Sequence, residues 1–210
     1  EEHVPFTREL AVLVARRPSG EIRAWPVVET VQRDGVCAEV LAPAPGLDPG
    51  LAAEAVEVAT RIAEGLDVTG VLAVEMFEYP GDGAAHTSAP RIAVNELAMR
   101  PHNSGHWTID GAVTSQFEQH LRAVLDLPLG PTDPRAPVSV MVNLLGSALP
   151  DPAAALGAVL ARCPRARVEL YGKEVRPGRK LGHVTVYGED LDAARQEARA
   201  AVALLGGETG

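Results

Sequence analysis

The stretch GVLAVEMFEYPGDGAAHTSAPRIAVNELAM (residues 70–99) indicates how the chain folds. Residues 70–79 and 91–99 are rich in apolar side chains, whereas the segment between them, 80–90, is rich in glycine and flanked by proline. Two apolar runs on either side of a turn-rich loop are typical of an antiparallel hairpin. We therefore expect a β-sheet in which these two runs are neighbouring strands.

Around this hairpin, the first half of the chain predicts a sheet with helices. Residues 6–17, 21–28 and 37–44 have a β-rich composition and are separated by the turn signals RPSG and RDG, which indicates antiparallel strands. Residues 51–66 place apolar side chains at helical spacing and predict a helix with one apolar stripe. The stripe consists of Leu51, Ala55, Ala59, Ile62 and Leu66.

A second helix is predicted at residues 114–126, after a polar loop. Its N-cap is expected at Thr114 or Ser115, because hydroxyl side chains are preferred there. Its apolar positions, at a spacing of four, are Phe117, Leu121 and Leu125.

Four prolines then fall within residues 128–137, where neither a helix interior nor a central strand can hold them. We therefore expect residues 1–130 to form one domain, 131–137 a Pro-rich linker and 138–210 a small C-terminal domain. Strands are predicted in this domain at 138–146, 166–171 and 182–188, and helices at 151–163 and 190–205.

Composition limits the functions that the chain can have. With 210 residues, 46% apolar and 22% charged, it can bury a good core, and its longest apolar runs fall far short of the roughly 20 residues that span a bilayer. A net charge of −9 without a basic, aromatic face argues against nucleic acid as a partner. Cys37 and Cys163 form neither a disulfide framework nor a zinc motif, which fits a reducing cytoplasm.

Two glutamates in the hairpin need an explanation. Glu75 has apolar neighbours on both faces of its predicted strand, and Glu96 should share its strand face with Ile92 and Val94. Burying a lone carboxylate is very unfavourable. Two half-buried carboxylates on adjoining strands repel unless one is protonated or a cation lies between them, and hard oxygen ligands favour magnesium.

The alternative is that each glutamate pairs with an arginine, for example Arg100 or Arg91. We favour the metal, because the polar cluster NELAMRPHNSGHW (residues 95–107) follows at once. Asn95 would add a carbonyl ligand, although its side chain should face away from that of Glu96.

The run NELAMRPHNSGHWTIDGAVTSQFEQHLRAVLDLPLG (95–130), preceded by GVLAVEMF and followed by VMVNLLG and YGKEVRPGRKLGHV, resembles the carboxy-terminal half of the 5-(carboxyamino)imidazole ribonucleotide synthases. These are ATP-grasp enzymes of purine biosynthesis. The likeness covers nearly the whole chain, although Met99 stands where the family more often has proline. It implies an α+β fold: the carboxy-terminal part of an ATP-grasp domain, an antiparallel sheet with helices, followed by a small α+β C-terminal domain.

The resemblance also implies a reaction. Members of this family use ATP to phosphorylate bicarbonate, and the resulting carboxyphosphate, or carbon dioxide released from it, carboxylates the amine of 5-aminoimidazole ribonucleotide. By this likeness Glu75 and Glu96 bind Mg²⁺ at the ATP phosphates, and Asn95 lies beside them. Glu1 and Glu2 resemble the hinge that meets adenine, and Glu9 the carboxylate that receives the ribose hydroxyls.

The polar cluster would then hold the reactants. Arg100 would clamp an anionic oxygen, His102 would orient the attacking amine or accept its proton, and Asn103 and Ser104 would fix the substrate. His106 is given only a supporting role. The alternative is that a loop of His, Asn and Ser satisfies its own backbone.

The segment YGKEVRPGRKLGH (171–183) is the candidate phosphate site. Its basic residues stand against Glu174 alone, and a Pro-Gly turn brings its two flanks close. A basic turn on a solvated surface is the common alternative, but in the similar family this segment contacts the 5′-phosphate of the ribonucleotide. The residues concerned are Lys173, Arg176, Arg179 and Lys180.

The chain opens with EEHVPFTREL and shows neither an initiator Met nor a secretion signal, so we expect it to begin inside a larger protein. Without the lobe that covers the ATP phosphates in such enzymes, it should not complete the reaction alone. The resemblance also implies a cytoplasmic homodimer for the full-length enzyme. Two rival hypotheses are another ATP-grasp carboxylase or formyltransferase, and a non-catalytic nucleotide- or phosphate-binding fragment.

Overall fold

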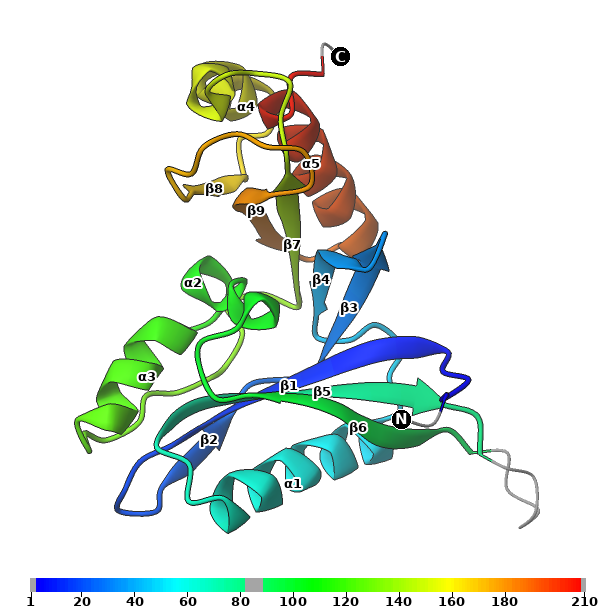
Figure 1. The fold of residues 1–210 in the computed structure, drawn as a ribbon, viewed down its shortest axis with the longest axis vertical. Coiled ribbons are helices and arrows are strands. Elements are labelled where there is room, and N and C mark those ends of the chain that lie inside the picture. The colour runs from blue at the N-terminus through cyan, green and yellow to red at the C-terminus, as the bar shows by residue number, and fades with distance from the viewer. Residues whose placement is uncertain (1–2, 82–88, 209–210) are drawn as a thin grey trace.

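The computed structural model describes residues 3–81 and 89–208. Within these residues the strands form one nine-stranded antiparallel sheet in the order β6-β5-β1-β3-β4-β7-β9-β8, with β2 paired to β1 (Figure 1). The strands are β1 (Arg8–Arg16), β2 (Ile22–Ala24), β3 (Val28–Arg33), β4 (Val36–Ala42), β5 (Gly70–Tyr79), β6 (Arg91–Ala98), β7 (Val138–Leu145), β8 (Arg167–Leu170) and β9 (Lys180–Gly188).

Helices lie on both sides of this sheet, which confirms the α+β class. They are α1 (Pro49–Gly65), α2 (Thr108–Gly111), α3 (Gln116–Val124), α4 (Leu156–Arg162) and α5 (Leu191–Leu205), with 3₁₀ turns η2 (Asn103–Gly105) and η3 (Pro152–Ala155). In the part of the chain that the structure describes, no helix combines the length and hydropathy needed to cross a bilayer.

The predicted hairpin is present as β5 and β6, and the predicted loop residues 82–88 lie outside the described residues. The register shifts within it: Glu75 pairs with Glu96, but Met76 pairs with Val94. Asn95 is therefore the extra residue of a β-bulge in β6.

The helix α1 matches its prediction closely. Asp48 caps it by accepting hydrogen bonds from the backbone of Gly50 and Leu51 at 2.9 and 3.0 Å. Its buried residues are Leu51, Ala55, Ala59 and Ala63, and the three alanines pack against apolar side chains of β1 and β5. The prediction that Leu66 belongs to the apolar stripe was wrong, because Leu66 is the C-cap residue and is 57% exposed.

For the helix α3 the sequence predicted the position correctly but the buried face wrongly. It begins after the N-cap Ser115, as expected, but the predicted apolar stripe faces solvent: Phe117 is 43% exposed and Leu121 60%. Leu125, the C-cap residue, is 66% exposed. The buried residues of α3 are instead Gln116, Gln119 and Ala123.

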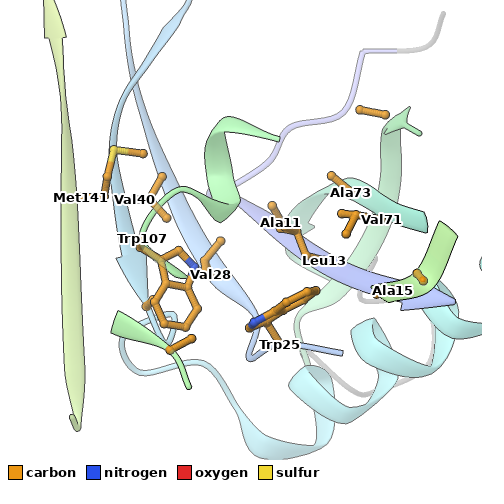
Figure 2. Packing of buried hydrophobic residues seen from close by; sticks show 14 of the residues in the cluster. Ala11, Leu13, Ala15, Trp25, Val28, Val40, Val71, Ala73, Trp107 and Met141 are labelled. Carbon is orange, nitrogen blue, oxygen red and sulfur yellow. The ribbon is translucent and has the colours of Figure 1, made fainter. Parts of the chain in front are cut away.

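Two tryptophans fill the core on the α3 side of the sheet. Figure 2 shows Trp107 beside Val28, Val40 and Met141, all within one buried cluster. Trp25 belongs to the same cluster, and its indole donates a hydrogen bond to the Thr114 carbonyl at 3.1 Å, which ties the start of α3 to the sheet.

Three other boundaries differ from the predictions. Residues 21–28 do not form one strand, because Pro26 has no N–H to donate, and β3 runs on from Val28 to Arg33. The predicted loop before α3 contains η2 and α2. The predicted helix at 151–163 opens as the 3₁₀ turn η3 before α4 begins at Leu156.

The sheet continues across the Pro-rich segment, because β4 from the first half pairs with β7 from the second. The helix α5 supports this junction. Arg195 and Arg199 of α5 each donate to the Glu39 carboxylate of β4 at 2.7 Å, and Glu39 is almost fully buried. Both units therefore share one sheet and one buried ion cluster.

Candidate active site

The two candidate metal ligands lie opposite each other on neighbouring strands. Because Glu75 and Glu96 are direct cross-strand partners, their side chains share one face of the sheet. The bulge at Asn95 places Val94 on the other face, and Ile92 with it, so the prediction that both share a face with Glu96 was wrong. The Glu96 side chain is also exposed rather than half-buried.

The pair fits a magnesium ion that takes its other ligands from elsewhere. In the described residues, no group of three or more His, Cys, Asp or Glu side chains could hold a metal. Mg²⁺, however, is commonly bound through one or two carboxylates together with substrate phosphates and water. The hard oxygen donors of Glu75 and Glu96 suit that arrangement.

Glu75 is paired with a histidine, not with the arginine of the alternative prediction. The Nε2 atom of His102 lies 3.1 Å from Glu75 Oε1, and its Nδ1 atom lies 2.8 Å from Ser104 Oγ. His102 Nδ1 also accepts from the Ser104 N–H at 3.4 Å, which caps η2. With Nδ1 as the acceptor, the ring proton is on Nε2 and points at the carboxylate.

This contact sets the charge of Glu75. The hydrogen bond from His102 is the largest effect, and it holds the pKa of the Glu75 carboxyl below its usual value against the opposing effect of burial. The nearby cations Lys180 and Arg100 lower the pKa further. Glu75 is therefore ionised at neutral pH.

An amide pair connects the loop of residues 102–106, which the sequence predicts to be catalytic, to the C-terminal unit. Asn103 donates to Asn143 Oδ1 at 3.0 Å, and Asn143 donates back to Asn103 Oδ1 at 2.8 Å. Asn143 also donates to the Cys37 carbonyl at 2.9 Å. Lys180 Nζ lies 3.3 Å from Asn103 Oδ1, so the predicted phosphate segment reaches the predicted catalytic loop.

These groups surround a cavity of about 400 Å³. Six residues predicted from the sequence line it: Glu9, Glu75, His102, Asn103, Ser104 and Lys180. Glu9 accepts a hydrogen bond from Gln32 at 2.6 Å within this lining. Burial raises the pKa of the Cys37 thiol in the wall to about 11, so it stays protonated.

Among the other predicted residues that the structure describes, Glu96, Asn95, Arg100 and the basic residues 173, 176 and 179 do not line this cavity. Arg100 is exposed and donates to the Pro101 carbonyl at 3.2 Å. In the phosphate segment, Arg176 is paired with Glu174 at 2.6 Å, and Arg179 donates to the Glu174 carbonyl at 3.3 Å. Lys173 lies over the Tyr171 ring, 5.0 Å from its centroid. Asn95 is exposed, and Glu1 and Glu2 lie outside the described residues.

A cluster of rings behind the loop, of which His183 is fully buried, was not predicted. The His106 ring stacks on His183 and Phe117, with centroids 5.1 and 5.6 Å apart, and the Tyr171 hydroxyl lies 2.7 Å from His183 Nδ1. Burial lowers the pKa of His106 to about 4 and that of His183 to about 3. Both rings are neutral at pH 7. The available signal was the alternation of His183 and Thr185 with apolar residues along β9.

Gln116 was also missed. Its side chain accepts a hydrogen bond from the His102 N–H at 2.8 Å and donates to the His102 carbonyl at 2.8 Å and to His106 Nδ1 at 2.7 Å. These hydrogen bonds explain why α3 turns its glutamine face inward. An apolar residue at position 116 would leave the N–H and carbonyl of His102 unpaired.

Known proteins match this chain along most of its length. A family model of the ATP-grasp domain matches residues 1–117, and one of the phosphoribosylaminoimidazole carboxylase C-terminal domain matches residues 139–197. The chain is 55% identical over 207 residues to N5-carboxyaminoimidazole ribonucleotide synthase of Corynebacterium ammoniagenes, covering 98% of this chain and 49% of that protein. It is 58% identical over 194 residues to the Mycobacterium tuberculosis protein of the same name, and this match covers 91% of this chain and 43% of that protein.

Solved structures agree. The N5-carboxyaminoimidazole ribonucleotide synthetase of Thermus thermophilus superposes with a TM-score of 0.83 at 44% identity, covering 100% of this chain and 53% of that one. The Aspergillus clavatus synthase in complex with ADP and 5-aminoimidazole ribonucleotide superposes with a TM-score of 0.84 at 37% identity, covering 98% of this chain and 53% of that one. The expected fold and resemblance are thus confirmed, and the chain spans about half the length of the curated relatives it matches.

Proposed function

This chain belongs to the ATP-grasp family, and we propose that it is part of an ATP-dependent ligase that carboxylates 5-aminoimidazole ribonucleotide with bicarbonate. The observation that carries the proposal is the cavity in which Glu75, His102 and Lys180 meet. A carboxylate for a metal, an imidazole for a proton and an ammonium for a phosphate are the three groups that this reaction needs.

Glu75 and Glu96 would hold Mg²⁺ at the phosphates of ATP. The ion would supply neutralisation of the charge that develops during phosphoryl transfer to bicarbonate. The lowered pKa of Glu75 supports this role, because only the ionised carboxylate is a good magnesium ligand. We assign nucleotide contacts to Glu1, Glu2, Glu9 and Asn95 from the family resemblance.

His102 would orient the amine of the ribonucleotide and take up its proton. The Nε2 atom of His102 lies 3.1 Å from Glu75 Oε1 and its Nδ1 atom 2.8 Å from Ser104 Oγ, and these two contacts orient the ring for that role. Asn103 and Ser104 would bind the substrate beside it, and Arg100 would clamp an anionic oxygen at the rim. Carboxyphosphate hydrolyses readily, so these groups must act in an enclosed site.

Lys180 would bind the 5′-phosphate of the ribonucleotide. It is the residue of the basic segment that lines the cavity, whereas Lys173, Arg176 and Arg179 lie outside the lining and would reach a phosphate only at the rim. The proposal includes a homodimer and a cytoplasmic location for the full-length protein, both from the family resemblance.

The proposal is tested by calorimetric titration of the chain with 5-aminoimidazole ribonucleotide and, separately, with inorganic phosphate. Lys180→Ala should weaken ribonucleotide binding by about tenfold or more, because a charge-assisted hydrogen bond contributes roughly 1.5–3 kcal/mol. Arg165→Ala is the matched control, since Arg165 pairs with Glu197 of α5 and does not line the cavity.

Equal losses in both variants would contradict the assignment of Lys180. Ribonucleotide binding no tighter than that of inorganic phosphate would favour a simple phosphate-binding fragment. Product formation from ATP, bicarbonate and the ribonucleotide should be absent with this chain alone, which spans about half of its relatives.

A further inference from the structure

We propose that Gln116 is the positioning residue of the histidine loop, residues 102–106, and that it fixes the backbone position of His102 and the proton position on the ring of His106. This inference rests on the proposed function only where it concerns the substrate. The positioning itself stands on the contacts of a fully buried side chain in α3.

The Gln116 amide behaves as an additional peptide group for the loop. Oε1 accepts from the His102 N–H at 2.8 Å, and Nε2 donates to the His102 carbonyl at 2.8 Å. Nε2 has a second hydrogen, which it donates to His106 Nδ1 at 2.7 Å. Every donor of the amide is used, and both ends of the loop are attached to one side chain.

These partners fix the orientation of the amide and the proton on His106. A flipped amide would direct its oxygen at the His102 carbonyl and its NH₂ group at the His102 N–H, so both contacts would become repulsive. With Nε2 donating, His106 Nδ1 must accept, and the proton of the neutral ring is then on His106 Nε2. The low pKa of His106 keeps the ring neutral, as this contact requires.

The middle of the loop is held against the same residue. The backbone N–H of Gln116 donates to Thr108 Oγ1 at 2.9 Å, and that hydroxyl donates to the Gly105 carbonyl at 2.6 Å. A Cβ atom on Gly105 would lie 2.5 Å from Gln116 Oε1 and 2.2 Å from Leu13 Cδ2. The loop backbone at Gly105 thus lies so close to Leu13 and Gln116 that only glycine fits at this position.

Gln119 provides a matched comparison one turn along α3. It is also fully buried, and its amide makes the same double contact with a backbone, to the N–H and carbonyl of Gly130 at 2.8 Å each. Removing the Gln119 amide also leaves one backbone N–H and one carbonyl unpaired, but these belong to Gly130, at the start of the Pro-rich segment and away from the histidines. A general loss of packing would affect both glutamines alike.

The experiment compares Gln116→Met with Gln119→Met in the 210-residue chain by NMR. Two-bond ¹H–¹⁵N spectra report which nitrogen of His106 carries the proton, and hydrogen exchange reports the protection of the His102 amide. Gln116→Met should mix the two forms of the His106 ring and speed exchange at His102 by about tenfold relative to α1 amides. Gln119→Met should change neither.

An unchanged His106 ring and an unchanged His102 amide in Gln116→Met would overturn the proposal, as would equal changes in both variants. If Gln116→Met does not fold, Gln116→Glu decides. Its carboxylate can still accept from the His102 N–H but cannot donate to His106 Nδ1, so His102 should remain protected while the proton of the His106 ring moves from Nε2 to Nδ1.

A separate measurement, the affinity for 5-aminoimidazole ribonucleotide, tests whether the loop position that Gln116 sets matters for substrate binding. Weaker binding in Gln116→Met but not in Gln119→Met would support the step from loop position to substrate. Unchanged binding together with a released loop would refute that step alone and leave the positioning role intact.

Discussion

The helices α1 and α3 pack on opposite faces of the same strands, β1 and β5, and they are attached by opposite means. The inner face of α1 is Leu51 and a row of alanines against apolar side chains. The inner face of α3 is led by two glutamines that bind backbone groups, and its apolar side chains point outward.

The difference follows from what each face of the sheet must do. Burial of apolar area is strong but non-directional, so it attaches α1 without fixing it to a fraction of an ångström. Hydrogen bonds require particular distances and angles, so α3 defines the position of the loop it binds. The directional attachment is on the face that carries His102 and Glu75.

The largest effect should come from placing a charge in the α1 stripe. Ala59→Glu puts a carboxylate against a fully buried apolar cluster, which should lower the free energy of unfolding by about 4 kcal/mol or more. Urea unfolding measures it. Ala53→Glu, on the exposed side of the same helix, should stay within about 0.5 kcal/mol. Similar losses at both positions would show that α1 is not held by its stripe.

The next largest effect should come from replacing a buried polar residue of α3 by an apolar one, a change that we expect to destabilise the protein. Gln119→Leu adds an apolar side chain at a buried position but leaves the N–H and carbonyl of Gly130 unpaired, so stability should fall by roughly 2–4 kcal/mol. Leu121→Gln makes the reverse change at a 60% exposed position and should be nearly neutral. A stabilising Gln119→Leu would break the contrast between the two helices.

An effect that is smaller for each residue should separate the two faces of the sheet by their response to pH. His106 and His183 have pKa values of about 4 and about 3 when folded, against 6.5 when free, so below pH 6.5 the unfolded chain binds protons that the folded chain excludes. Each of the two histidines should therefore lower stability by roughly 2 kcal/mol between pH 7 and pH 5. Lys173, Lys180 and His102 face His106 and act in the same direction.

Hydrogen exchange, corrected for its intrinsic pH dependence, gives the local measurement. Between pH 7 and pH 5, residues 104–108 should lose more protection than α1. The variant with His106→Asn and His183→Asn should show a flatter pH dependence of stability. Uniform loss of protection on both faces would assign the acid sensitivity to other groups.

Periodicity was sufficient to find the elements but not to orient all of them. The spacing of Phe117, Leu121 and Leu125 located α3, and the same spacing in α1 located its buried stripe. Which face is buried depends on the surface opposite, and opposite α3 the backbone of His102 needs partners. A loop backbone leaves no pattern in the sequence of the helix that binds it.

The candidate site was predicted in part for the same reason. Residue chemistry located Glu75 and the family resemblance selected His102 and Lys180, and the fold brings all three to one cavity. The bulge at Asn95 could not be predicted, because one extra residue in a strand depends on cross-strand pairing. Gln116, Asn143 and His183 act through contacts distant in sequence, and single polar residues among apolar ones gave too weak a signal.

The pairing of β4 with β7 determines how this molecule can be divided. Cutting the chain within residues 131–137 would leave each of these strands with a row of unpaired backbone groups along an open edge. Open edges recruit strands from other molecules, so the separated pieces would tend to aggregate or to exchange partners. The short Pro-rich tether prevents this by keeping the correct strand at a high effective concentration.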